Sequence, residues 1–232
     1  MKFSIEHGPS FAWLRVELAG GESIQAEAGS MVTRTPALGM TTRLNAGRGA
    51  GVVRKLWALL IALARKFLGG ETMFVNEFGG PAGGEVVLAP HLSGQILHRK
   101  LVAGQRLLVQ SGSFLASTGT VDTKLRFGGL RALFGGEGLF LLECSGDGDV
   151  FINAYGSIEE VVVSGTFVVD TGHIVAFEGS LDFSVKGAGG GLMGLIFSGE
   201  GLVCEFRGNG KLYVQSRNIN ALVSWLTPFL RS

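Results

Sequence analysis

Residues 108–115 read Leu-Val-Gln-Ser-Gly-Ser-Phe-Leu, and this order of residue types sets the pattern of the whole chain. A short apolar run, a turn around a glycine and the start of a second apolar run are typical of two β-strands. The same order recurs at residues 24–32 and 167–175. We therefore predict three copies of one β unit, with equivalent landmark glycines at Gly29, Gly112 and Gly172.

Two further landmarks follow each of these glycines in the same order. The first is a Gly-Glu pair after an apolar stretch, and its glutamates are Glu71, Glu137 and Glu200. The second is a strand-like run that begins with a glycine ten to thirteen residues after the glutamate. Three ordered landmarks that occur three times indicate tandem repeats. We place the copies at residues 1–82, 83–146 and 147–232 of one compact unit.

The runs between these landmarks predict the fold class. They consist of four to eight Val, Ile, Leu and Phe residues bounded by Gly, Asn and Asp, which is the signature of strands and turns. Tight hairpins are expected at Asn209-Gly210 and in the glycine-rich run 145–149, because these sequences favour type I′ turns. The 38 glycines are about twice the average share. We predict an all-β protein with double-stranded β-helix-like or β-sandwich repeats in a pseudo-threefold arrangement.

Helix is expected at two places. One is the C-terminal segment 220–230, with Asn218 or Asn220 as its N-cap. We expect this short helix to close the core of the third copy. The other is an inserted amphipathic helix in the first copy, at residues 50–68.

Charge and cysteine content exclude several classes of protein. The chain has 20 Lys and Arg against 19 Asp and Glu, a net charge of +1, so it lacks the basic excess of a general nucleic-acid binder. The first residues contain no apolar h-region and include Glu6, which predicts a cytoplasmic protein without a signal peptide. Cys144 and Cys204 each lie in an apolar run, and we expect buried, reduced thiols.

The insert distinguishes the first copy from the other two. From the landmark glycine to the Gly-Glu pair, the first copy uses 41 residues where the others use 24 and 27. Seven basic residues and no acid lie between Ala28 and Gly70. On a helical wheel the basic side chains gather on one arc and the bulky apolar ones on the other. The residues expected to contact a partner or membrane are Arg54, Lys55, Trp57, Arg65 and Lys66.

Three interpretations of this helix stay open. It can lie across the β core and show its basic face to water, dock on another subunit, or lie on an anionic membrane surface. Its unbroken apolar run covers only residues 56–64, far below the roughly 20 residues of a membrane-spanning helix. The sequence predicts no transmembrane span but allows peripheral membrane binding.

Motifs that would carry catalysis are weak. Residues 189–194 match G-x-G-x-x-G, but too few residues follow for the helix that a dinucleotide site requires. The four histidines are scattered along the chain, which argues against a metal site. The three repeated glutamates could converge on a common axis and shift each other's pKa values, or simply accept backbone N–H bonds in turns. We predict no catalytic residue, no cofactor and no bound metal.

The ordered landmarks resemble those of the mitochondrial biogenesis family named for altered inheritance of mitochondria, whose bacterial members formed a domain group of unknown function. The resemblance covers the whole chain. It rests on Ala-Gly-Ser-Met at 28–31, on Gly-Glu-Gly-Leu at 136–139 and 199–202, and on Asn-Ala-Tyr-Gly at 153–156 with its counterpart at 214–217. It implies a triplicated fold like that of the tryptophan RNA-binding attenuation protein, assembly into larger oligomers and no catalytic residues.

Two functional hypotheses follow from these observations. The first is a non-enzymatic β scaffold that acts by homo-oligomeric assembly and by binding a protein or an anionic membrane surface. The second is a regulatory module that binds a small ligand or nucleic acid in the β layers. Fold analogy alone does not transfer tryptophan or RNA binding, and the net charge disfavours nucleic acid.

Overall fold

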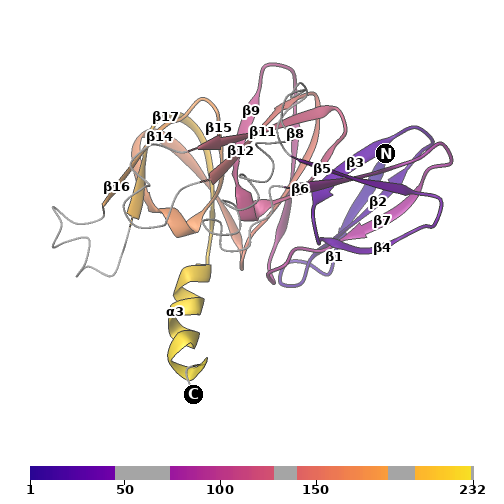
Figure 1. Ribbon diagram of the computed structural model, residues 1–232. Coiled ribbons are helices and arrows are strands. Elements are labelled where there is room, and N and C mark those ends of the chain that lie inside the picture. Colours follow the sequence, from indigo (N-terminus) through magenta and orange to yellow (C-terminus); the bar gives the residue numbers. More distant parts are fainter. Residues whose placement is uncertain (45–73, 128–139, 188–201, 231–232) are drawn as a thin grey trace, which may run out of the picture.

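The computed structural model describes residues 1–44, 74–127, 140–187 and 202–230, and their strands form three antiparallel sheets placed in a row (Figure 1). The prediction of an all-β protein is confirmed. The first sheet has the strand order β1-β2-β7-β4, the middle sheet β5-β6-β3-β10-β13-β8, and the third sheet β11-β12-β9-β15-β17-β14, with β16 paired to β17. The threefold arrangement and the resemblance to the tryptophan attenuation protein stay predictions.

The strand bounds are as follows. The first sheet contains β1 (Lys2–Glu6), β2 (Trp13–Leu18), β4 (Met31–Arg34) and β7 (Gly84–Leu88). The middle sheet contains β3 (Ser23–Glu27), β5 (Gly39–Leu44), β6 (Phe74–Gly79), β8 (Ile96–Leu101), β10 (Phe114–Thr118) and β13 (Gly148–Asn153). The third sheet contains β9 (Arg106–Gln110), β11 (Val121–Phe127), β12 (Phe140–Gly146), β14 (Ile158–Asp170), β15 (Ile174–Glu178), β16 (Asp182–Gly187) and β17 (Leu202–Gln215).

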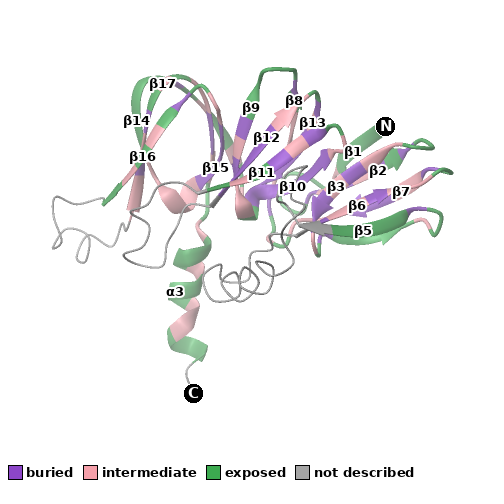
Figure 2. Cartoon of the chain, turned by 45° about the horizontal axis from the view of Figure 1, so that its top comes forward, coloured by how far each residue is buried: buried purple, intermediate pink, exposed green. Residues whose placement is uncertain are grey.

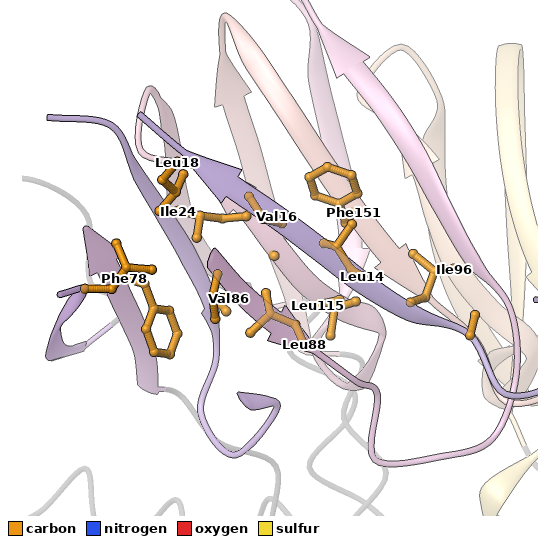
Figure 3. Close-up of a cluster of buried hydrophobic side chains, with 14 residues drawn as sticks. Leu14, Val16, Leu18, Ile24, Phe78, Val86, Leu88, Ile96, Leu115 and Phe151 are labelled. Carbon is orange, nitrogen blue, oxygen red and sulfur yellow. The ribbon is translucent and has the colours of Figure 1, made fainter. Parts of the chain in front are cut away.

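Alternating residues on β2 build the first core. Leu14, Val16 and Leu18 are buried, while the residues between them face outward, as expected for a strand with one wet face. They pack with Phe78 and with residues of β3 and β7 (Figure 3). The apolar alternation of the sequence therefore decides which face of this sheet is covered.

Aromatic side chains fill the core of the third sheet. Phe177 is fully buried, and its ring centroid lies 4.9 Å from that of Phe206 and 5.1 Å from that of Phe183. Both contacts are edge-on, the arrangement that ring quadrupoles favour. This cluster holds β15, β16 and β17 together.

Two short seams join strands that are distant in the sequence. Each seam is a row of three antiparallel residue pairs between neighbouring strands. In the middle sheet, β3 pairs with β10, and Ala26 faces Ala116. In the third sheet, β9 pairs with β15, and Val109 faces Ala176. Each seam thereby joins two half-sheets into one continuous sheet.

The predicted hairpins at 209–210 and 145–149 are both wrong. Asn209 lies within the unbroken strand β17, where it pairs with Ser164 of β14. At the other position, Gly146 ends β12 in the third sheet and Gly148 begins β13 in the middle sheet. The backbone groups at both positions are satisfied by ladder partners from distant segments, so no tight turn forms.

Charged side chains on the outer face of the first sheet form a network. The Arg15 guanidinium donates to Glu6 at 3.0 Å and to Glu85 at 2.6 Å, and the Trp13 indole donates to Glu6 at 2.7 Å. The hydrogen bonds from Arg15 and then Trp13 lower the pKa of the Glu6 carboxyl to about 2. The network thereby connects β1, β2 and β7.

We expect Phe177→Ala to lower the free energy of unfolding by about 3–5 kcal/mol, because it leaves a cavity among packed rings. The matched control is Phe11→Ala, since Phe11 is 76% exposed and its loss is expected to change stability by less than about 0.5 kcal/mol. Urea unfolding followed by circular dichroism measures both values. Equal effects of the two substitutions would contradict the assignment of this core.

We expect Glu6→Gln to destabilise the protein at neutral pH and to have less effect in acid. The Glu6 pKa is lower in the folded chain than the ordinary value of 4.5, so ionised Glu6 adds stability above that pH and loses it as the pH falls towards 2. Thermal unfolding of both proteins between pH 2 and 7 measures the difference. Glu17→Gln removes the same charge from an exposed position of β2 and is the control for the loss of one negative charge.

Candidate interaction surfaces

The landmark glycines lie in turns, and side-chain amides donate hydrogen bonds to two of them. Gly29 has a φ of +93° in the turn between β3 and β4, a conformation that favours glycine. The Asn153 amide donates to the Gly112 carbonyl at 3.4 Å, and the Gln215 amide donates to the Gly172 carbonyl at 2.9 Å. The glycines therefore build turns and offer no chemical group to a ligand.

The C-terminal helix α3 (Ile219–Leu230) forms where the sequence predicts it. The Asn218 side chain accepts hydrogen bonds from the backbone N–H groups of Asn220 at 2.8 Å and Ala221 at 3.4 Å, which confirms Asn218 as the N-cap. The expectation that the helix closes a core is wrong. It contains no buried residue and projects from the β layers (Figure 1), because the hydrophobic cores of the described residues are filled without it.

The exposed side of α3 is apolar. Trp225 is 64% exposed, and its ring lies 5.5 Å from that of the exposed Phe229. The helix has no charged residue between Ile219 and Leu230. The polar Asn220, Ser224 and Thr227 recur at helical spacing, so α3 is amphipathic. Its apolar side is exposed and has the character of a face that another molecule covers.

Two strand edges also expose apolar side chains. Strand β4 is the outer strand of the first sheet, with Met31 and Val32 exposed. Strand β14 is the outer strand of the third sheet, and Figure 2 shows much of it in the colour of exposed residues. Phe167 and Val168 are exposed on it. Within the described residues, the outer edges of both strands have no partner strand.

A charged cluster lies between the middle and third sheets. Arg99 of β8 lies 3.9 Å from Glu160 and 3.6 Å from Glu178, and its guanidinium stacks 5.3 Å from the centre of the Tyr213 ring. Lys211 forms a 2.6 Å ion pair with Glu160, and this hydrogen bond lowers the pKa of the Glu160 carboxyl. The opposite charges neutralise each other, so the cluster ties the two sheets together.

The residues that the sequence singles out for partner or membrane contact lie outside the described part of the chain. They are Arg54, Lys55, Trp57, Arg65 and Lys66, in the insert 50–68. The repeated Glu71, Glu137 and Glu200 and the glycine-rich run 189–194 lie outside it as well. Their roles stay predictions.

The thiols are buried and free, as the sequence predicts. Burial raises the pKa of the Cys204 thiol to about 12, and burial followed by the nearby Glu143 raises the pKa of the Cys144 thiol further. In the described ranges no three His, Cys, Asp or Glu residues are grouped so that they could hold a metal ion. No helix of those ranges has the length and apolar character needed to cross a membrane.

The apolar edges of β4 and β14 are surfaces that the strand pattern does not reveal, because the pattern alone does not tell which strand lies at an edge of its sheet. One available signal was the absence of charge from residue 161 to residue 169, because natural edge strands are usually protected by charged residues.

Comparison with known proteins gives the family. A model described as mitochondrial biogenesis AIM24 matches residues 3–217. The chain is 34% identical over 233 residues to the uncharacterized protein M6_Spy0233 of Streptococcus pyogenes serotype M6, covering 99% of this chain and 91% of that protein. The crystal structure of protein SPYM3_0169 from Streptococcus pyogenes is similar, with a TM-score of 0.79, 30% identity and 99% of each chain covered. The chain belongs to the AIM24 mitochondrial biogenesis family.

Proposed function

We propose that the protein is a non-enzymatic β scaffold that acts by homo-oligomeric assembly and by binding a protein or membrane surface. The observation that carries the proposal is the concentration of exposed apolar side chains on α3 and on the outer edges of β4 and β14. Large apolar patches on a soluble chain mark interaction sites. The described charged clusters are internally paired and offer less to a ligand.

The two kinds of surface suit two kinds of contact. An unpaired strand offers backbone N–H and C=O groups in a row and thereby favours another strand. An exposed apolar helix favours an apolar groove or the acyl boundary of a membrane. Assembly through strands and surface binding through the helix are therefore compatible within one molecule.

Membrane-surface binding is the second candidate because α3 ends in exposed aromatic and aliphatic side chains. Trp225 and Phe229 combine apolar area with little conformational freedom, and tryptophan is favoured at the boundary between lipid and water. In the sequence, the basic insert would add attraction to anionic lipids.

We expect light scattering after gel filtration to give at least twice the mass of one chain, together with a decrease of this mass on dilution. A single-chain mass at every concentration would contradict assembly.

Trp225→Ser with Phe229→Ser tests α3 separately, because these exposed residues are not needed for the β core. We expect this double variant to keep the mass and to lose surface binding.

We expect the protein to co-sediment with vesicles that contain about 30% phosphatidylglycerol at low salt, and to be released as salt screens the charges. Lys55→Glu with Lys66→Glu is expected to lower the bound fraction several-fold. Lys2→Glu with Lys124→Glu changes the net charge equally and is the matched control. Equal binding by both variants, or no binding by the unmodified protein, would contradict the membrane candidate.

A further inference from the structure

We propose that β4 of one copy pairs with residues 165–170 of β14 in a second copy, as antiparallel strands of one sheet that runs through both molecules. This inference rests on the proposed assembly function and specifies its contact. It is carried by the two seams already present inside the chain, which show how strands of these two kinds meet.

The internal seams share one geometry. In the middle sheet, Ala116 of β10 faces Ala26 of β3, and β10 has a register shift between Phe114 and Ala116 where it pairs with β13. In the third sheet, Ala176 of β15 faces Val109 of β9, and β15 has a register shift between Ile174 and Ala176 where it pairs with β17. Each seam therefore joins a bulged strand to a strand that ends two residues before a landmark glycine.

Strand β4 has the features of the bulged partner. Where it pairs with β7, its register shifts between Met31 and Thr33, the same spacing as in β10 and β15. Thr33 thus occupies the position of Ala116 and Ala176. In contrast to those strands, β4 has no seam on its other side within the described residues.

The C-terminal part of β14 has the features of the other partner. It precedes Gly172, as β3 precedes Gly29 and β9 precedes Gly112. One side of it is paired with the N-terminal part of β17, as β9 is paired with β12. Among the residues that the structure describes, its other side has no partner strand at the place where β9 binds β15. The described part of the chain thus has one unused strand of each kind.

The internal registers define the expected contact. Ala26 and Val109 lie three residues before their landmark glycines, and the corresponding residue of β14 is Val169. Thr33 of one copy therefore faces Val169 of the next. The antiparallel direction then places Arg34 opposite Val168 and Thr35 opposite Phe167.

The chemistry of the two edges suits this pairing. From residue 161 to residue 169, β14 carries no charge, and β4 has only Arg34. Asp170 lies two residues from Val168 and is a diagonal neighbour within reach of a long side chain such as that of Arg34. By contrast, the outer strand β8 carries consecutive residues His98, Arg99 and Lys100, the kind of charge that prevents edge pairing.

The position of the two edges requires a second copy. Strand β4 lies in the sheet at one end of the row, and β14 lies at the opposite end (Figure 1). The two edges of one chain are therefore separated by the middle sheet. Contact between unlike surfaces of successive copies forms a ring if the rotation closes and an open filament if it does not.

Substitution of Val168 tests the pair with Arg34. Val168→Lys places like charges opposite each other and is expected to raise the dissociation constant about tenfold, whereas Val168→Glu is expected to keep or lower it. Adding Arg34→Glu to Val168→Lys is expected to restore assembly. Val162→Lys is the matched control, because Val162 is exposed on the same strand but outside the expected contact. Equal effects of Val162→Lys and Val168→Lys would overturn the proposal.

Cysteine crosslinking tests the register. Full-length Thr33→Cys and Val169→Cys proteins are mixed and oxidised, and we expect a disulfide-linked dimer that the mixture of Thr33→Cys with Val162→Cys does not give. The buried native thiols with raised pKa values leave the introduced cysteines as the reactive ones. In the double variant Thr33→Cys with Val169→Cys, a series of disulfide-linked multimers supports the contact between copies. A disulfide within one chain overturns the proposal.

Light scattering on the same samples separates the two proposals. A multimer without the Thr33–Val169 crosslink would overturn this contact and leave assembly in place. A single-chain mass at every concentration would overturn both. Circular dichroism of each variant shows whether the β fold is kept.

Discussion

The structure depends on backbone pairing between strands that are distant in the sequence. Three residue pairs join β3 to β10, and three join β9 to β15. Each seam joins two parts of at least three strands into one larger sheet. The register shifts beside the seams bend the strands locally, so that neighbouring strands can cover different cores.

Joining sheets by strand pairing leaves unpaired strand edges at the two ends of the row. A chain built from parts that join by unlike edges finishes with one unused edge of each kind, unless it closes on itself. Here β4 and β14 are those edges, and they expose apolar side chains. The inner charges, in contrast, are paired, as in the Arg99 cluster between the middle and third sheets. Free binding capacity therefore lies at the periphery of the described structure.

Helix α3 adds a second peripheral surface with different physical properties. Its backbone is satisfied internally and capped by Asn218, so it offers apolar side chains and no hydrogen-bonding edge. Trp225 and Phe229 lie on the part that projects from the sheets. A strand edge selects its partner through register, whereas an apolar helix selects it through shape and apolar area. The two surfaces are suited to separate roles.

Local features were predictable from the sequence because they depend on neighbouring residues. Alternation identifies β2, a glycine marks the positive φ at Gly29, and an asparagine before an apolar run gives the N-cap of α3. The apolar surroundings of Cys144 and Cys204 correctly indicated burial. Family membership was also visible, since the landmarks keep their order along the whole chain.

The pairing of strands was decided only by the tertiary structure. Asn209-Gly210 has the local signature of a hairpin, yet Ser164 pairs with Asn209 and keeps it within a strand. The apolar residues of α3 indicate a core, yet the described cores are filled without the helix, and none of its residues is buried. Likewise, Val168 reads as an ordinary strand residue until the sheet order makes it an edge. By itself the sequence determined strand segments, the turns at the landmark glycines and the helix cap, because these follow from local propensity. Strand partners, sheet edges and side-chain exposure depended on long-range packing, which overrides local propensity at Asn209-Gly210.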